Sequence, residues 1–149
     1  MENKQSGFTL LELMVVTAIV GILGSIAAPA YQQYASKSQA TAALQDILGA
    51  KVTLEQKITE GLDMGEALSL SGSSGEVLAT VGITNPTTNR CSLIEVSVAN
   101  EGTASVTCTM LGSPSISGNT IAIVRSGTGV WTCQTTAASA IAPKGCAST

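Results

Sequence analysis

One carboxylate lies inside an apolar segment near the start of this 149-residue chain. The segment runs from Phe8 to Tyr31, and Glu12 is its only charged residue. An acidic side chain near the centre of a membrane helix costs about 2.5–3.5 kcal/mol on insertion scales, so its presence indicates a partner of opposite charge. Backbone cleavage after Gly7 would supply that partner, because the new amine of Phe8 would lie about one helical turn from Glu12. The predicted chemistry is peptide cleavage, with this chain as the substrate, followed by charge pairing.

Four cysteines form the second group of residues that could do chemistry. Their spacings of 17, 25 and 13 residues do not match the paired C-x2-C pattern of zinc sites. Beyond a membrane segment, in an oxidising compartment, they predict two disulfides, with four free thiols as the alternative. Among three connectivities we favour the sequential one, Cys91–Cys108 and Cys133–Cys146.

Residue types that serve catalysis or nucleic-acid binding are sparse. The chain has no His, its ten Asp and Glu residues are spread out, and its seven Lys and Arg residues form no run. Gly-rich phosphate loops and nucleophile elbows are also absent from the sequence. We therefore expect no catalytic residues, no metal and no cofactor. A membrane-anchored periplasmic enzyme remains the alternative of another class.

The N-terminal segment allows three interpretations. A secretory signal needs a cleavage site after a short apolar stretch; Ala28-Pro29-Ala30 is a weak one, and Glu12 and the length of the run argue against it. A plain membrane anchor, with Lys4 on the cytoplasmic side, explains everything except Glu12. Cleavage after Gly7, with the apolar run kept on the mature protein, explains Glu12 as well.

A single long helix is expected to position these groups, from Phe8 to about Glu60. The 24 residues of the apolar run span about 36 Å as a helix, enough to cross a bilayer. Pro29 removes a backbone donor, so the helix should be weak between Gly21 and Pro29. Small residues at positions 21, 24, 25 and 28 favour close helix packing. Gly61 is expected to end the helix.

The second half of this helix has an amphipathic pattern. Its apolar stripe should lie against a head domain, with Lys51 and Glu55 paired on the opposite side. The stripe consists of Ala40, Leu44, Ile47, Ala50, Leu54 and Ile58.

The rest of the chain predicts a loop followed by an antiparallel sheet. Residues 61–90 are rich in Gly, Ser and Thr, which indicates a long loop, with a short helix near Asp63–Leu70 and an exposed stretch at Ser71–Gly75. A turn at Asn100-Glu101-Gly102 should join the first two strands, with Cys91 not directly opposite Cys108. The expected class is α+β, a long helix on a four-stranded antiparallel sheet. The predicted strands are Leu93–Val98, Thr103–Met110, Thr120–Arg125 and Val130–Cys133.

The N-terminal sequence G-F-T-L-L-E-L-M-V-V-T-A-I-V-G-I-L-G-S-I-A-A-P-A-Y resembles the class III signal and N-terminal helix of type IV pilins. The resemblance implies that a prepilin peptidase cuts after Gly7 and N-methylates Phe8. It assigns Glu12 to subunit assembly through the Phe8 amine of a neighbour. It also makes Gly21 and Pro29 the helix-breaking positions.

A second resemblance lies at the C-terminus. G-V-W-T-C (129–133) and A-P-K-G-C (142–146) are similar to the disulfide-bounded D-region of type IVa major pilins. In such a region Trp131 would pack at the start of the loop, Thr135–Ala142 would be its exposed tip, and Lys144-Gly145 would form a turn.

Together the two resemblances imply a filament subunit. They predict a homopolymeric type IV pilus for adhesion and twitching motility, or DNA uptake, with a type II secretion pseudopilin or a minor or competence pilin as alternatives. The implied partners are the peptidase and methyltransferase, the inner-membrane assembly machinery, and host or abiotic surfaces. The subunit would wait in the inner membrane with a periplasmic head and end in an extracellular filament. The expected parts are a leader (1–7), a filament-core helix (8–31), an amphipathic half (32–60), a loop (61–90), a sheet (91–132) and the D-region with its tail (133–149).

Overall fold

The computed structural model describes residues 7–61, 70–99 and 101–149 of the chain. It divides into two compact units, Met1–Tyr34 and Ala35–Thr149. Most of the expected leader, the short helix expected near Asp63–Leu70 (except Leu70 itself), and Asn100 of the predicted turn lie outside the described residues.

Helix α1 (Leu10–Glu60) is a single 51-residue element. It ends as predicted at Gly61, whose φ of 92° is a left-handed conformation that glycine adopts without a Cβ clash. The expected break at Gly21 and Pro29 is not present, because α1 is continuous and Pro29 lies inside it. A proline costs a helix about 3 kcal/mol, which the bonded turns on either side can absorb. The non-helical stretch implied for filaments is therefore absent from this single subunit and stays a prediction for the assembled form.

The first unit is an apolar helix with an exposed surface. Every residue from Gly7 to Tyr34 is exposed, including Phe8 at 84% and Leu10 at 76%. Among the described residues, α1 is the one helix long and apolar enough to cross a membrane, a statement based on length and composition alone. Exposed apolar surface on this scale needs lipid or other helices to cover it.

The second unit contains a five-stranded sheet in the order β1-β2-β3-β4-β5. The first four strands form the predicted antiparallel meander, within two residues of the expected bounds at each end. The prediction of four strands is wrong, since a short fifth strand runs parallel to β4. It was missed because three residues are too few to show a period. The bounds are β1 (Cys91–Val98), β2 (Ala104–Met110), β3 (Thr120–Arg125), β4 (Trp131–Thr135) and β5 (Cys146–Ser148).

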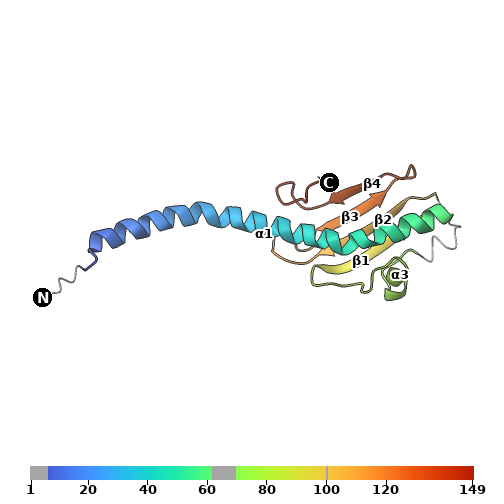
Figure 1. Ribbon diagram of the computed structural model, residues 1–149, viewed down its shortest axis with the longest axis horizontal. Helices are drawn as coiled ribbons and strands as arrows, with labels where there is room; N and C mark the ends of the chain where they lie inside the picture. The colour runs from blue at the N-terminus through green and yellow to red at the C-terminus, as the bar shows by residue number, and fades with distance from the viewer. Residues whose placement is uncertain (1–6, 62–69, 100) are drawn as a thin grey trace, which may run out of the picture. The chain divides into compact units, whose positions relative to one another are not determined.

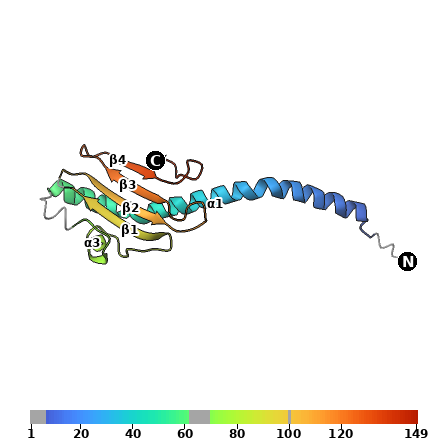
Figure 2. The ribbon, with the colours of Figure 1, turned by 180° about the vertical axis from the view of Figure 1, so that it is seen from behind.

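The second half of α1 covers one face of this sheet, as the front and back views show (Figures 1 and 2). The buried residues of α1 recur every three or four positions, which is one face of a helix. Leu44 and Ile58, expected in the stripe, are only partly buried. The buried set is Ser36, Ala40, Ala43, Ile47, Ala50 and Leu54.

The inner face of the sheet supplies the other half of the core. Along β2 and β3, and along β1 from Leu93 onward, the residues alternate between buried and more exposed. One buried row crosses the sheet from Val96 to Val106 and Ile123. The row continues through Cys133 to Cys146 at the far edge, where the side chains are only partly buried. Alternating strands against a helical stripe are therefore what fix the α+β fold.

A short helix lies in the segment expected to be loop. Helix α3 (Gly75–Thr80) begins after Ser74, whose hydroxyl accepts a hydrogen bond from the Val77 amide. Leu78 of α3 is fully buried. The expected loop, with its short helix near Asp63–Leu70, did not include a helix at Gly75–Thr80, so the prediction is wrong there. The Ser74 cap and the burial of Leu78 are enough to hold this short helix. Six residues are too few to show a helical period in the sequence, so α3 was not predicted.

Candidate functional site

The start of α1 forms a capping box around Glu12. Glu12 Oε2 accepts hydrogen bonds from the amide nitrogen and from Oγ1 of Thr9, each at 2.9 Å. In return, the Glu12 amide donates to Thr9 Oγ1 at 3.3 Å. This reciprocal pattern satisfies two of the free amides that begin every helix. The carboxylate singled out by the sequence is therefore held in a defined position at the helix N-terminus.

Thr9 is the residue of this site that sequence reasoning missed. Its signal was present as the spacing T-x-x-E directly before an apolar helix. Both of its bonds to the carboxylate end on the same oxygen, Oε2. Gly7 and Phe8 precede the helix and are exposed. The structure thus places the cleavage and assembly residues of the resemblance together at one accessible helix end.

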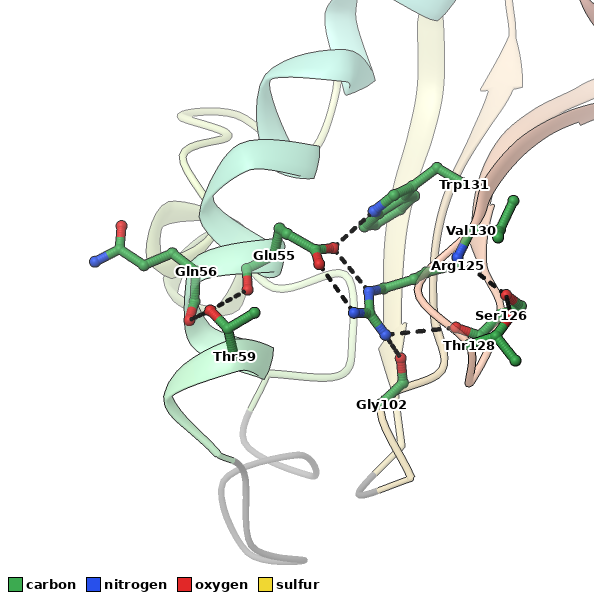
Figure 3. A network of polar contacts seen from close by, with 9 residues as sticks. All are labelled: Glu55, Gln56, Thr59, Gly102, Arg125, Ser126, Thr128, Val130 and Trp131. Carbon is green, nitrogen blue, oxygen red and sulfur yellow. Dashed lines mark hydrogen bonds and ion pairs between the residues drawn. The ribbon is translucent and has the colours of Figure 1, made fainter.

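A polar network joins α1 to the sheet in the head (Figure 3). Arg125, at the end of β3, donates from Nε and Nη2 to the two carboxylate oxygens of Glu55 at 2.7 and 2.9 Å. The Trp131 indole donates to the same carboxylate at 2.8 Å. Arg125 Nη1 donates to the Gly102 carbonyl at 2.6 Å. One carboxylate therefore ties α1 to β3, β4 and, through Arg125, the turn between β1 and β2.

The expected surface pair of Lys51 and Glu55 is wrong, because Glu55 belongs to this network. Glu55 turns toward the sheet and pairs with Arg125, whose side chain is only 9% exposed. Lys51 instead lies 5.9 Å from the centre of the Trp131 ring, at cation–π distance. A buried guanidinium must be paired, and that requirement outweighs a helix pair between neighbours.

The network also changes the acidity of its charged groups. Hydrogen bonds from Arg125, and then from Trp131, lower the pKa of Glu55 from 4.5 to about 2. The hydrogen bonds with Glu55 raise the pKa of Arg125 above its ordinary value. The ionised pair is therefore the form that the folded head favours.

We expect the head to lose stability as the pH falls from about 4.5 toward 2. In that range Glu55 of the unfolded chain takes up a proton while Glu55 of the folded head remains ionised, so protons favour unfolding. The Glu55 contribution is fully present above the unfolded pKa and is lost on passing through the folded one. Melting temperatures measured across this range should fall less steeply for Glu55→Gln than for the wild type.

Glu95→Gln is the matched control for this pH dependence. Glu95 is an exposed carboxylate on the outer face of β1. Its variant should follow the wild-type curve, because it leaves the Arg125 pair in place. Equal slopes for Glu55→Gln and the wild type would show that the pair does not contribute.

Two disulfides hold the sheet. Cys91 is bonded to Cys108, with Cα atoms 5.4 Å apart, and Cys133 to Cys146, with Cα atoms 4.4 Å apart. This is the connectivity that the spacing favoured. Cys108 faces Ile94, and a register irregularity brings Cys91 within reach. Cys133 and Cys146 are direct partners in the parallel pair of β4 and β5.

The loop between these last two strands is less exposed than expected. The predicted tip, Thr135–Ala142, contains four buried residues and Thr135 belongs to β4. Small side chains let this loop pack against the core. The prediction of an exposed tip did not take this packing into account. The turn predicted at Lys144-Gly145 is present, with Gly145 at φ 87°. The buried residues are Thr135, Ala137, Ile141 and Ala142.

Two cationic side chains of the head form ion pairs within the head. Arg125 is bonded to Glu55, and Arg90 Nη1 lies 3.2 Å from a carboxylate oxygen of Asp46. These pairs disfavour a basic strip for a nucleic-acid backbone, which needs several accessible cations together. Among the described residues, no group of three His, Cys, Asp or Glu could hold a metal ion.

Comparison with known proteins decides the family. The pilin family (bacterial filament) matches residues 36–147 of the chain. The family of the prokaryotic N-terminal methylation motif matches residues 3–28. The chain is 33% identical to a type IV major fimbrial protein FimA of Dichelobacter nodosus, over 98% of each chain. This chain belongs to the type IV pilin family.

Other relatives of this pilin are of the same kind. It is 35% identical to a type IV major alpha-pilin of Moraxella bovis, over 89% of this chain and 86% of the relative. It is 36% identical to a fimbrial protein of Pseudomonas aeruginosa, over 90% and 88%. The crystal structure of a Cs1 pilin chimera aligns with a TM-score of 0.61 at 22% identity, over 77% of this pilin and 98% of the chimera. That likeness supports the fold, and it confirms the predicted long helix on a sheet.

Proposed function

We propose that this pilin is the major structural subunit of a type IV pilus and has no catalytic role. The observation that carries the proposal is the capping box at Thr9 and Glu12, next to Gly7 and Phe8 on an exposed apolar helix. Peptidase cleavage after Gly7 would create an amine at Phe8, and the same enzyme would methylate it. Each Glu12 would then pair with the Phe8 amine of a neighbouring copy.

The exposed surface of the first unit supports a filament core built from these helices. In the inner membrane, lipid would cover the apolar side chains from Phe8 to Tyr31, with the head in the periplasm. In the filament, the helices of other copies would replace the lipid. The assembly machinery would move the helix from the membrane into the filament. A weakened helix between Gly21 and Pro29 would let this segment adapt during assembly.

Adhesion and twitching motility are the roles we assign to the assembled filament. The head would face host or abiotic surfaces, and extension and retraction would be driven by separate motor proteins. We do not assign direct DNA binding, because Arg90 and Arg125 are held in ion pairs.

The mature N-terminus tests the proposal most directly. Filaments sheared from the cell surface should yield a chain that begins with N-methylated Phe8, with Met1 to Gly7 removed. Cells without the prepilin peptidase should keep the leader and show no filaments. Surface protein that still begins at Met1 in normal cells would overturn the proposal.

A further inference from the structure

The two disulfides differ in how a reductant can reach them. Cys91 and Cys108 are both 0% exposed in the core of the head. Cys133 and Cys146 lie on the last two strands and are only partly buried. Thiol–disulfide exchange requires a thiolate to approach one sulfur, so its rate depends on access. In the folded head, Cys133–Cys146 is therefore the bond open to exchange.

Strand β5 depends on this bond for its place in the sheet. It has three residues, lies at the edge of the sheet and pairs with β4 in parallel. Such a short parallel pair is marginal without further support. Beyond the strand pairing, the Thr149 amide and hydroxyl donate to the Thr135 carbonyl at 2.9 and 3.3 Å, and the Ser148 hydroxyl donates to the Ala137 carbonyl at 2.6 Å.

The rest of the head has anchors that do not involve this bond. Ile141 and Ala142 are buried just before β5 and hold the preceding loop. The Cys91–Cys108 bond joins β1 to β2. The antiparallel pairs from β1 to β4 are longer than the pair that includes β5. Loss of Cys133–Cys146 would therefore loosen the C-terminus before the core.

We propose that Cys133–Cys146 is a redox clasp that a dithiol opens in the folded subunit, releasing β5 and exposing the edge of β4. A thiolate of the dithiol attacks one sulfur, the Cys133–Cys146 bond breaks and a mixed disulfide forms. The second thiol then displaces the protein sulfur. The dithiol is oxidised to a disulfide, and two protons pass to the two cysteine thiolates. The chemistry that opens the bond is that of a dithiol, which a thiol–disulfide oxidoreductase also carries.

The test uses the full-length protein in detergent micelles, treated with increasing dithiothreitol and then alkylated with iodoacetamide. Peptide mass spectrometry should find Cys133 and Cys146 labelled together. Labelling of Cys91 and Cys108 should be at least about 100-fold slower, because it requires opening of the core. Hydrogen exchange after selective reduction should lose protection at Cys146–Thr149 and keep it in β1, β2 and β3.

A Cys133→Ser, Cys146→Ser double variant is the matched control. Its exchange pattern should not change with dithiothreitol, and its C-terminus should already be unprotected. Labelling of all four cysteines at one rate would overturn the proposal, as would a lack of any labelling below the unfolding transition. Selective reduction that removes protection across the whole sheet would also overturn it. The wild-type measurement needs no variant to fold, and it is independent of filament assembly.

Discussion

Cells that carry Glu12→Ala should process the pilin normally and yet show almost no surface filaments. Leader cleavage depends on the bond between Gly7 and Phe8, which the substitution leaves unchanged. In the filament core, however, the Phe8 amine of each neighbour would lack its counter-charge, and an unpaired buried charge costs several kcal/mol. We expect filament protein sheared from the surface to fall at least about 100-fold, since each 1.4 kcal/mol changes an equilibrium tenfold. Immunoblots of sheared and membrane fractions measure both effects.

Glu12→Gln separates the charge from the capping box. Its amide oxygen can still accept the two hydrogen bonds from Thr9 that hold the carboxylate in the single subunit. It carries no charge for a neighbour's amine. We expect this variant to be cleaved and to fail in assembly like Glu12→Ala. Normal filaments from Glu12→Gln would mean that the hydrogen bonds alone suffice, and normal filaments from Glu12→Ala would contradict the pairing account.

Regular elements of this pilin could be predicted because their residues repeat along the chain. The long helix follows from the apolar run and from the stripe that contains Ala40, Ile47 and Leu54, all of which are buried in the structure. The strands follow from alternation, which extends over six or seven residues in Leu93–Val98 of β1, in β2 and in β3. The α+β fold could therefore be predicted from the period of the apolar residues and from the length of each periodic segment.

The features that sequence reasoning missed depend on contacts between distant residues. Glu55 had an obvious neighbour in Lys51, but its partner Arg125 lies 70 positions away. Only the folded sheet brings that guanidinium to α1. Likewise β5 is defined by its pairing with β4 and has too few residues for a pattern of its own. Thr9 is the exception, because its capping-box spacing is local and could have been recognised.

Leu54→Ala should destabilise the head strongly while leaving the apolar N-terminal segment intact. Leu54 is 0% exposed and lies on the face of α1 that packs against the sheet. Truncating a buried leucine to alanine costs about 2–5 kcal/mol through lost burial and the cavity left behind. That is a large part of the roughly 5–15 kcal/mol that stabilises a typical domain. Thermal unfolding of the detergent-solubilised pilin, followed by near-ultraviolet circular dichroism of Trp131, should show the loss as a lower melting temperature.

Val52→Ala provides the matched control on the same turn of α1. Val52 is 73% exposed, so its truncation removes little buried surface and leaves no cavity. We expect a change within about 0.5 kcal/mol of the wild type, as for most surface substitutions. Both substitutions lie on α1, the helix that also contains the apolar segment expected to form the filament core. If Leu54→Ala and Val52→Ala were equally stable, the stripe on α1 would not be what holds the sheet, and the head would have to depend on its two disulfides and the Glu55–Arg125 pair instead.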